Sequence, residues 1–94
     1  MNKTAQIFSE RALKRGGLYL YSRSDAMEYI LACQVEKIHL LGIDGFRLTG
    51  DTTQPSMNNS VDFSSSFFEE DIYKYALAFL VKQPEELFFE IVFE

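Results

Sequence analysis

The feature that most constrains the fold is an almost wholly apolar run, Leu87 to Phe93, interrupted only by Glu90. Such a run is typical of a strand in the middle of a sheet, buried largely on both faces. Just before it, five apolar residues follow the i, i+3, i+4, i+7, i+8 spacing of an amphipathic helix: Ile72, Tyr75, Ala76, Phe79 and Leu80. The sequence therefore predicts a last helix that begins at a Ser66–Glu69 capping box and ends at Gln83-Pro84, followed by a central strand.

The first half of the chain alternates helical and extended patterns. Residues 4–15 predict a short amphipathic helix, capped by Thr4 and ended by Gly16-Gly17. A strand is expected over 18–21, a second helix from about residue 24 to 34, and a strand over 37–41. The strand–helix–strand segment over 18–41 has room for a right-handed crossover.

The middle of the chain is richer in turn residues. Asp44-Gly45 predicts a hairpin turn, with a returning strand over 46–49. Residues 50–59 have the composition of a long loop, and residues 60–63 are expected to form a short edge strand. The chain of 94 residues fits one domain, 1–94, so we predict an α+β fold: a mixed sheet of about four to five strands with three helices.

Charge limits the partners that this chain suits. Nine basic residues against fourteen acidic ones give a net charge of −5, and no basic stripe is present to grip nucleic-acid phosphates. No apolar run approaches the ~20 residues that cross a bilayer, so we expect neither a membrane partner nor a signal peptide. The single cysteine, Cys33, is expected to be a buried, inert thiol, and a cytoplasmic location fits best. An acidic protein of this kind favours a basic partner or simply solubility.

No catalytic centre is evident. The acids Asp44, Asp51 and Asp62 match no compact metal-binding motif, so we expect no metal and no cofactor. His39 is interpreted as a core or sheet-face histidine rather than a general base. One alternative remains open: a ligand-binding or enzymatic domain that uses the 50–59 loop as a lid, with His39, Asp44 and Asp62 as its polar groups. A structural adaptor of unknown partner is another.

Candidate partner-binding residues fall in three groups. Tyr19 and Tyr21 share one face of a strand and form a surface stripe if Leu18 and Leu20 point inward; alternatively, a helix covers the tyrosines. The second group is an aromatic and acidic patch, which a helix start would explain equally well: Phe67, Glu69, Glu70 and Asp71. The third group is the three loop acids: Asp44, Asp51 and Asp62.

Several segments together resemble one protein family. They are residues 39–46 (HLLGIDGF), 53–55 (TQP), 61–64 (VDFS) and 89–92 (FEIV), which span about half of the chain. They resemble small bacterial immunity proteins of polymorphic toxin systems, in particular the immunity protein 40 group. The resemblance implies a compact α+β domain near 100 residues that protects the producing cell by binding the catalytic domain of a toxin.

The resemblance agrees with the acidic composition. It implies an inhibitor without a catalytic group, acting on a cognate toxin that is expected to be basic. The chain itself is expected to be a monomer, or a homodimer if its C-terminal strand lies at a sheet edge. We expect occlusion of the toxin's active site, with contacts from residues 44–59 and from the acidic patch. No toxin-contacting positions transfer from the family.

Overall fold

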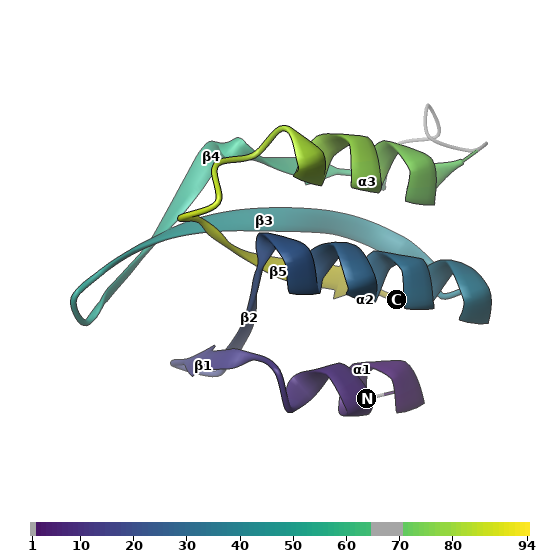
Figure 1. The fold of residues 1–94 in the computed structure, drawn as a ribbon, viewed down its shortest axis with the longest axis horizontal. Helices are drawn as coiled ribbons and strands as arrows, with labels where there is room; N and C mark the ends of the chain where they lie inside the picture. The colour runs from purple at the N-terminus through teal and green to yellow at the C-terminus, as the bar shows by residue number, and fades with distance from the viewer. Residues whose placement is uncertain (1, 65–70) are drawn as a thin grey trace.

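The computed structural model describes residues 2–64 and 71–94 (Figure 1). The described residues form eight elements: α1 (Lys3–Ser9), β1 (Leu13–Arg15), β2 (Leu18–Ser22), α2 (Arg23–Glu36), β3 (Leu40–Thr49), β4 (Thr52–Asp62), α3 (Ile72–Val81) and β5 (Phe88–Phe93). The five strands make one sheet in the order β1-β2-β5-β3-β4. The predicted α+β domain with three helices is therefore confirmed. No helix within the described residues is long and apolar enough to cross a membrane.

Strand β5 lies in the centre of the sheet, as its apolar run predicts. It pairs with β2 on one side and with β3 on the other, both antiparallel. The predicted mixed sheet is wrong, because every strand pair among the described residues is antiparallel. The crossover through α2 leaves β2 and β3 parallel in direction, but β5 inserts between them and is antiparallel to both.

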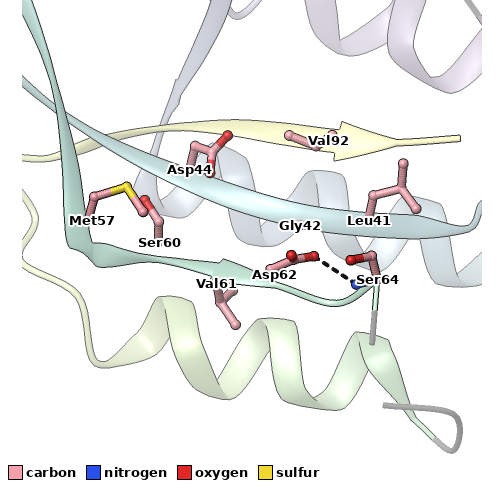
Figure 2. Close-up of a pocket in the computed structure, with 9 residues that line it drawn as sticks. All are labelled: Leu41, Gly42, Asp44, Met57, Ser60, Val61, Asp62, Ser64 and Val92. Carbon is pink, nitrogen blue, oxygen red and sulfur yellow. Dashed lines mark hydrogen bonds between the residues drawn. The ribbon is translucent and has the colours of Figure 1, made fainter. Parts of the chain in front are cut away.

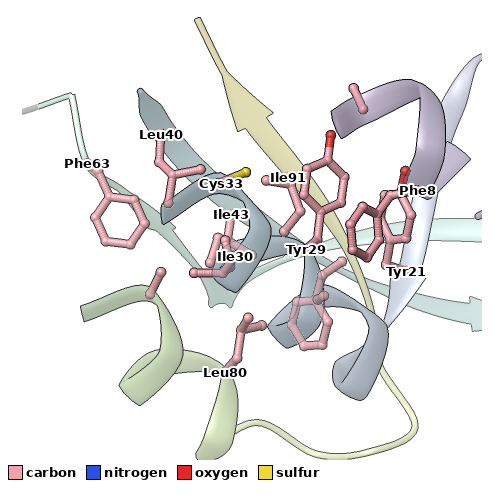
Figure 3. Close-up of a cluster of buried hydrophobic side chains, with 14 of the residues drawn as sticks. Phe8, Tyr21, Tyr29, Ile30, Cys33, Leu40, Ile43, Phe63, Leu80 and Ile91 are labelled. Carbon is pink, nitrogen blue, oxygen red and sulfur yellow. The ribbon is translucent and has the colours of Figure 1, made fainter. Parts of the chain in front are cut away.

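The core lies between the helices and one face of the sheet (Figure 3). Side chains from all three helices meet strand residues that share this face, among them the cross-strand neighbours Tyr21–Phe89 and Ile43–Ile91. Cys33 of α2 is fully buried in this cluster, as predicted.

The N-terminal segment differs from the prediction of one long helix over 4–15. Helix α1 ends at Ser9, and Asn2 rather than Thr4 caps it by accepting from the Ala5 amide at 2.7 Å. Gly16 and Gly17, with φ of 52° and 88°, form the turn of the β1–β2 hairpin rather than a helix end. Two consecutive residues with positive φ match the twist of a tight hairpin, which explains the Gly-Gly pair.

The β3–β4 hairpin also differs from the prediction. Strand β3 runs through Asp44-Gly45 without a turn, and the chain reverses at Gly50, whose φ is 58°. The expected loop over 50–59 is almost entirely part of β4, so it cannot act as a lid. Its polar composition suits β4 because β4 is the edge strand of the sheet, where polar residues and Pro55 limit pairing with other chains.

The two longer helices begin at side-chain caps. Ser22 accepts from the Asp25 amide at 3.3 Å at the start of α2, and Asp71 accepts from the Lys74 amide at 3.0 Å at the start of α3. The Ser66–Glu69 capping box lies outside the described residues. Within the described residues, helix α3 begins at Ile72, directly after its Asp71 cap, and it ends at Val81, close to the predicted end.

Candidate functional site

The helices pack on one face of the sheet, and the opposite face carries two carboxylates side by side. Ile43 and Ile91 are cross-strand neighbours that face the helical core, so the next pair along the strands, Asp44 and Glu90, faces the other way. Like charges directly opposite each other destabilise a sheet by about 0.2–1 kcal/mol. Burial, and then the Asp44 carboxylate, raise the pKa of Glu90.

Beside this pair the sheet face is hollowed. A depression of about 480 Å³ is lined by residues of β3, β4 and β5 (Figure 2). Leu41, Gly42 and Val92 give it an apolar floor, and Asp44 and Asp62 are its acids. No lysine, arginine or histidine lies among its lining residues in the described part of the chain.

Two irregularities in strand pairing shape this hollow. The register between β3 and β5 shifts between Leu40 and Gly42, so Leu41 is an extra residue there. On the other side of β3, Ile43 pairs with Val61 and Gly45 pairs with Ser56. Two steps along β3 therefore correspond to five steps along β4, from Val61 back to Ser56. The extra residues of β4 include Met57 and Ser60, which line the hollow; Met57 is 83% exposed.

Hydrogen bonds hold this bulge of β4 in place. The Ser60 hydroxyl donates to the Ser56 carbonyl at 2.8 Å and accepts from the Gly45 amide at 3.0 Å. A Cβ on Gly45 would lie 2.3 Å from the Asn59 carbonyl oxygen, so only glycine permits this approach. The sequence Asp44-Gly45 thus marks a close contact between strands and not a turn.

Asp62 is the exposed acid at the end of β4. Its Oδ1 accepts from the Ser64 amide at 2.8 Å (Figure 2), and hydrogen bonding by Ser64 lowers the pKa of Asp62. Its carboxylate is therefore ionised at neutral pH and fixed at the rim of the hollow.

The structure brings together only part of the predicted partner-binding set. Asp44 and Asp62 line one hollow, whereas Asp51 is exposed at the tip of the β3–β4 hairpin. Asp71 is the N-cap of α3, which is the alternative explanation that its position allowed. Phe67, Glu69 and Glu70 lie outside the described residues.

The predicted tyrosine stripe is wrong. Tyr19 is 37% exposed, but Tyr21 is only 3% exposed because α1 and α2 cover this face of β2. Leu20 on the opposite face is also fully buried, so Tyr19 is the one exposed side chain of the expected pair. The alternative, a helix over the tyrosines, is correct for Tyr21.

Sequence reasoning missed Glu90, Leu41 and Val92, and it included Met57 only as part of the 44–59 contact segment. Glu90 had a signal, since it alone interrupts the apolar run of β5. Leu41 and Val92 had none, because only the two bulges bring them to the hollow.

The polar set expected for an enzymatic alternative does not assemble in one place. His39 is exposed, and its Nε2 lies 4.0 Å from a Glu94 carboxylate oxygen at the end of β5. It is not one of the residues that line the hollow with Asp44 and Asp62.

Comparison of the chain with protein-family models, with curated proteins and with solved structures finds no significant match. The candidate site therefore rests on the geometry of the sheet face alone.

Proposed function

We propose that this protein is an inhibitor of the immunity type, which binds a basic toxin domain through the face of the sheet that the helices leave uncovered. The observation that carries the proposal is the hollow itself, which combines an apolar floor with the carboxylates of Asp44 and Asp62. Apolar area surrounded by charge is the composition expected of a protein interface, where the apolar centre supplies affinity and the charges set specificity.

The Asp44–Glu90 pair supports the same proposal. A like-charged pair on adjacent central strands lowers the stability of the free protein, and a partner cation placed between the two carboxylates would relieve this repulsion. A basic partner thus gains more from binding here than at isolated surface acids. The net charge of −5 would also speed its association at low salt.

Met57 supplies an apolar contact at the rim. It is the most exposed large apolar side chain among the described residues, and its flexible thioether adapts to irregular partner surfaces. Occlusion of the toxin's active site by this face requires no reactive group on the inhibitor.

The direct test is co-purification with the protein encoded by the adjacent reading frame, followed by calorimetric titration of the purified pair. We expect a stable complex whose affinity falls with rising salt. Asp44→Asn and Asp62→Asn should each weaken binding, whereas Glu36→Gln, which removes an equal charge from the end of α2, should not. Absence of measurable binding to the adjacent product contradicts the toxin proposal, and equal losses in all three variants contradict the assigned face.

A further inference from the structure

A second, smaller pocket lies on the opposite side of the sheet from the hollow. Strand β2 pairs with β5 only at Tyr21 and Ser22, and its earlier residues pair with β1 instead. A pocket of about 150 Å³ is present where β2 and β5 are no longer paired. Residues of four elements line it: Ala5, Tyr19, Tyr21, Tyr29, Glu90, Ile91 and Phe93.

Two nearly buried tyrosines line this pocket. Tyr21 and Tyr29 are 3% and 2% exposed, and no protein group in the described residues hydrogen-bonds to either hydroxyl. In the described part of the chain, every side-chain oxygen that is fully enclosed has a hydrogen-bond partner. Because these two hydroxyls have no protein partner, both must reach solvent. Both residues line the same pocket, which offers that contact. Two hydroxyls that share one pocket and bond to no protein group are free to accept from a ligand there.

The aromatic rings around the pocket are held rigidly. Tyr29 stacks on Phe8 with ring centroids 4.8 Å apart and meets Tyr21 edge-on at 5.1 Å (Figure 3). The centroid of Tyr29 lies 6.4 Å from that of Phe93. Burial, and then its neighbour Tyr19, raise the pKa of Tyr21 to about 12. The phenol groups therefore stay neutral and present oxygen lone pairs and π-electrons.

The aromatic rings near the pocket favour a cation. Glu90 also lines the pocket, but its carboxylate faces Asp44 on the other side of the sheet and supplies no charge here. Two cations of the chain itself already lie over adjoining rings: Lys14 Nζ is 5.6 Å from the centroid of Tyr19, and the Arg11 guanidinium carbon is 4.9 Å from that of Phe8. Clustered aromatic rings are a recurrent way of binding ammonium groups.

We propose that the Tyr19–Tyr21–Tyr29 pocket binds an alkylammonium group. Its N–H groups donate to the tyrosine hydroxyls, and its methylenes lie against Ile91 and Phe93. The pocket holds about five waters at ~30 Å³ each, which suits such a group with a short chain. Lys14 stands near this position and competes with the ligand. The inference does not depend on the proposed toxin or on the hollow.

The test is an NMR titration of the full chain, with labelled tyrosine rings, at constant ionic strength. The probes are n-butylammonium, the neutral 1-butanol and the anionic butyrate. We expect n-butylammonium alone to give saturable shifts at Tyr21 and Tyr29. A second arm uses Nα-acetyl-lysine methylamide. Binding as strong as that of n-butylammonium indicates a lysine side chain of a protein as the natural ligand, and weaker binding indicates a free small amine.

Conservative variants separate binding from a structural effect. Tyr21→Phe and Tyr29→Phe each remove one hydroxyl and keep the ring, so we expect affinity for n-butylammonium to fall roughly two- to tenfold. Lys14→Gln should strengthen binding by removing the competing cation. Tyr75→Phe, on α3 away from the pocket, is the matched control and should have no effect. Butyrate binding, equal shifts with 1-butanol, or unchanged affinity in both pocket variants would overturn the proposal and leave ordered water as the content of the pocket.

Discussion

Replacing Gly45 by alanine tests whether the close approach of β3 and β4 shapes the hollow. A Cβ at this position would lie 2.3 Å from the Asn59 carbonyl oxygen, which is 1.1 Å short of the 3.4 Å at which ordinary contact begins. Asn59 is not free to retreat. Its side chain donates to Gln83 at 2.7 Å and accepts from the Ser56 hydroxyl at 2.6 Å.

The magnitude follows from two opposing terms. Forcing an extra methyl group into a packed region costs about 1–3 kcal/mol, and alanine in a strand recovers about 0.5–1 kcal/mol relative to glycine. Because the clashing atom belongs to a fixed backbone, the cost should lie at or above the upper end of its range. We therefore expect Gly45→Ala to lower the free energy of unfolding by about 2 kcal/mol. For a domain of this size, that lowers Tm by roughly 8–16 °C.

The assay is urea unfolding at 25 °C followed by far-ultraviolet circular dichroism. Gly42→Ala is the matched control, because its Cβ would lie 2.8 Å from the Val61 carbonyl oxygen and needs a smaller adjustment. A Gly45→Ala protein that is as stable as the wild type, or more stable than Gly42→Ala, would refute the reasoning. It would mean that the bulge of β4 is free to move.

Three further predictions concern stability and reactivity. Burial and Asp44 raise the folded-state pKa of Glu90. Just above pH 4.5 the native state therefore binds more protons than the unfolded state, so the wild type should gain stability as pH falls through that window. Glu90→Gln should remove this pH dependence and stabilise the protein at pH 7 by about 0.2–1 kcal/mol in urea unfolding. Asp71→Ala removes the cap of α3 and should cost about 1 kcal/mol in thermal melts, whereas Asp71→Asn should cost little. Burial raises the pKa of the Cys33 thiol to about 12, so a thiol reagent should react at the rate of unfolding and faster in Gly45→Ala.

Each of these has an outcome that contradicts it. A Glu90→Gln protein with the pH profile of the wild type would show that the carboxylate is fully solvated. An Asp71→Ala protein with unchanged Tm would show that the Asp71 cap does not stabilise α3. Rapid complete labelling of Cys33 in native buffer would show that the core opens easily.

The elements that the sequence predicts well are those whose pattern is local and complete. The apolar run of β5 indicates a strand buried on both faces, and the spacing from Ile72 to Leu80 indicates a helix, whatever their neighbours are. The Gly16-Gly17 pair is different, since it fits both a helix end and a hairpin turn. The choice depends on whether Leu13–Arg15 finds a partner strand, and β2 is that partner.

The candidate site was predictable only in part. Asp44 and Asp62 were expected to bind a partner because they are acids in apparent loops, yet both lie on strands and share a hollow through the β3–β4 pairing. Glu90 joins them because the β3–β5 register places it opposite Asp44. No local pattern encodes such a register.

By itself, the sequence determined the class of the protein: a small acidic α+β domain with a central apolar strand and an amphipathic helix before it. These properties depend on side-chain periodicity and charge, which are local. The tertiary structure decided which strands are neighbours, where the two bulges fall, which face stays uncovered, and that Tyr21 and Tyr29 share a pocket. These depend on pairing between segments far apart in the chain, because the free energy that selects one register comes from burial of the whole sheet face and not from any single segment.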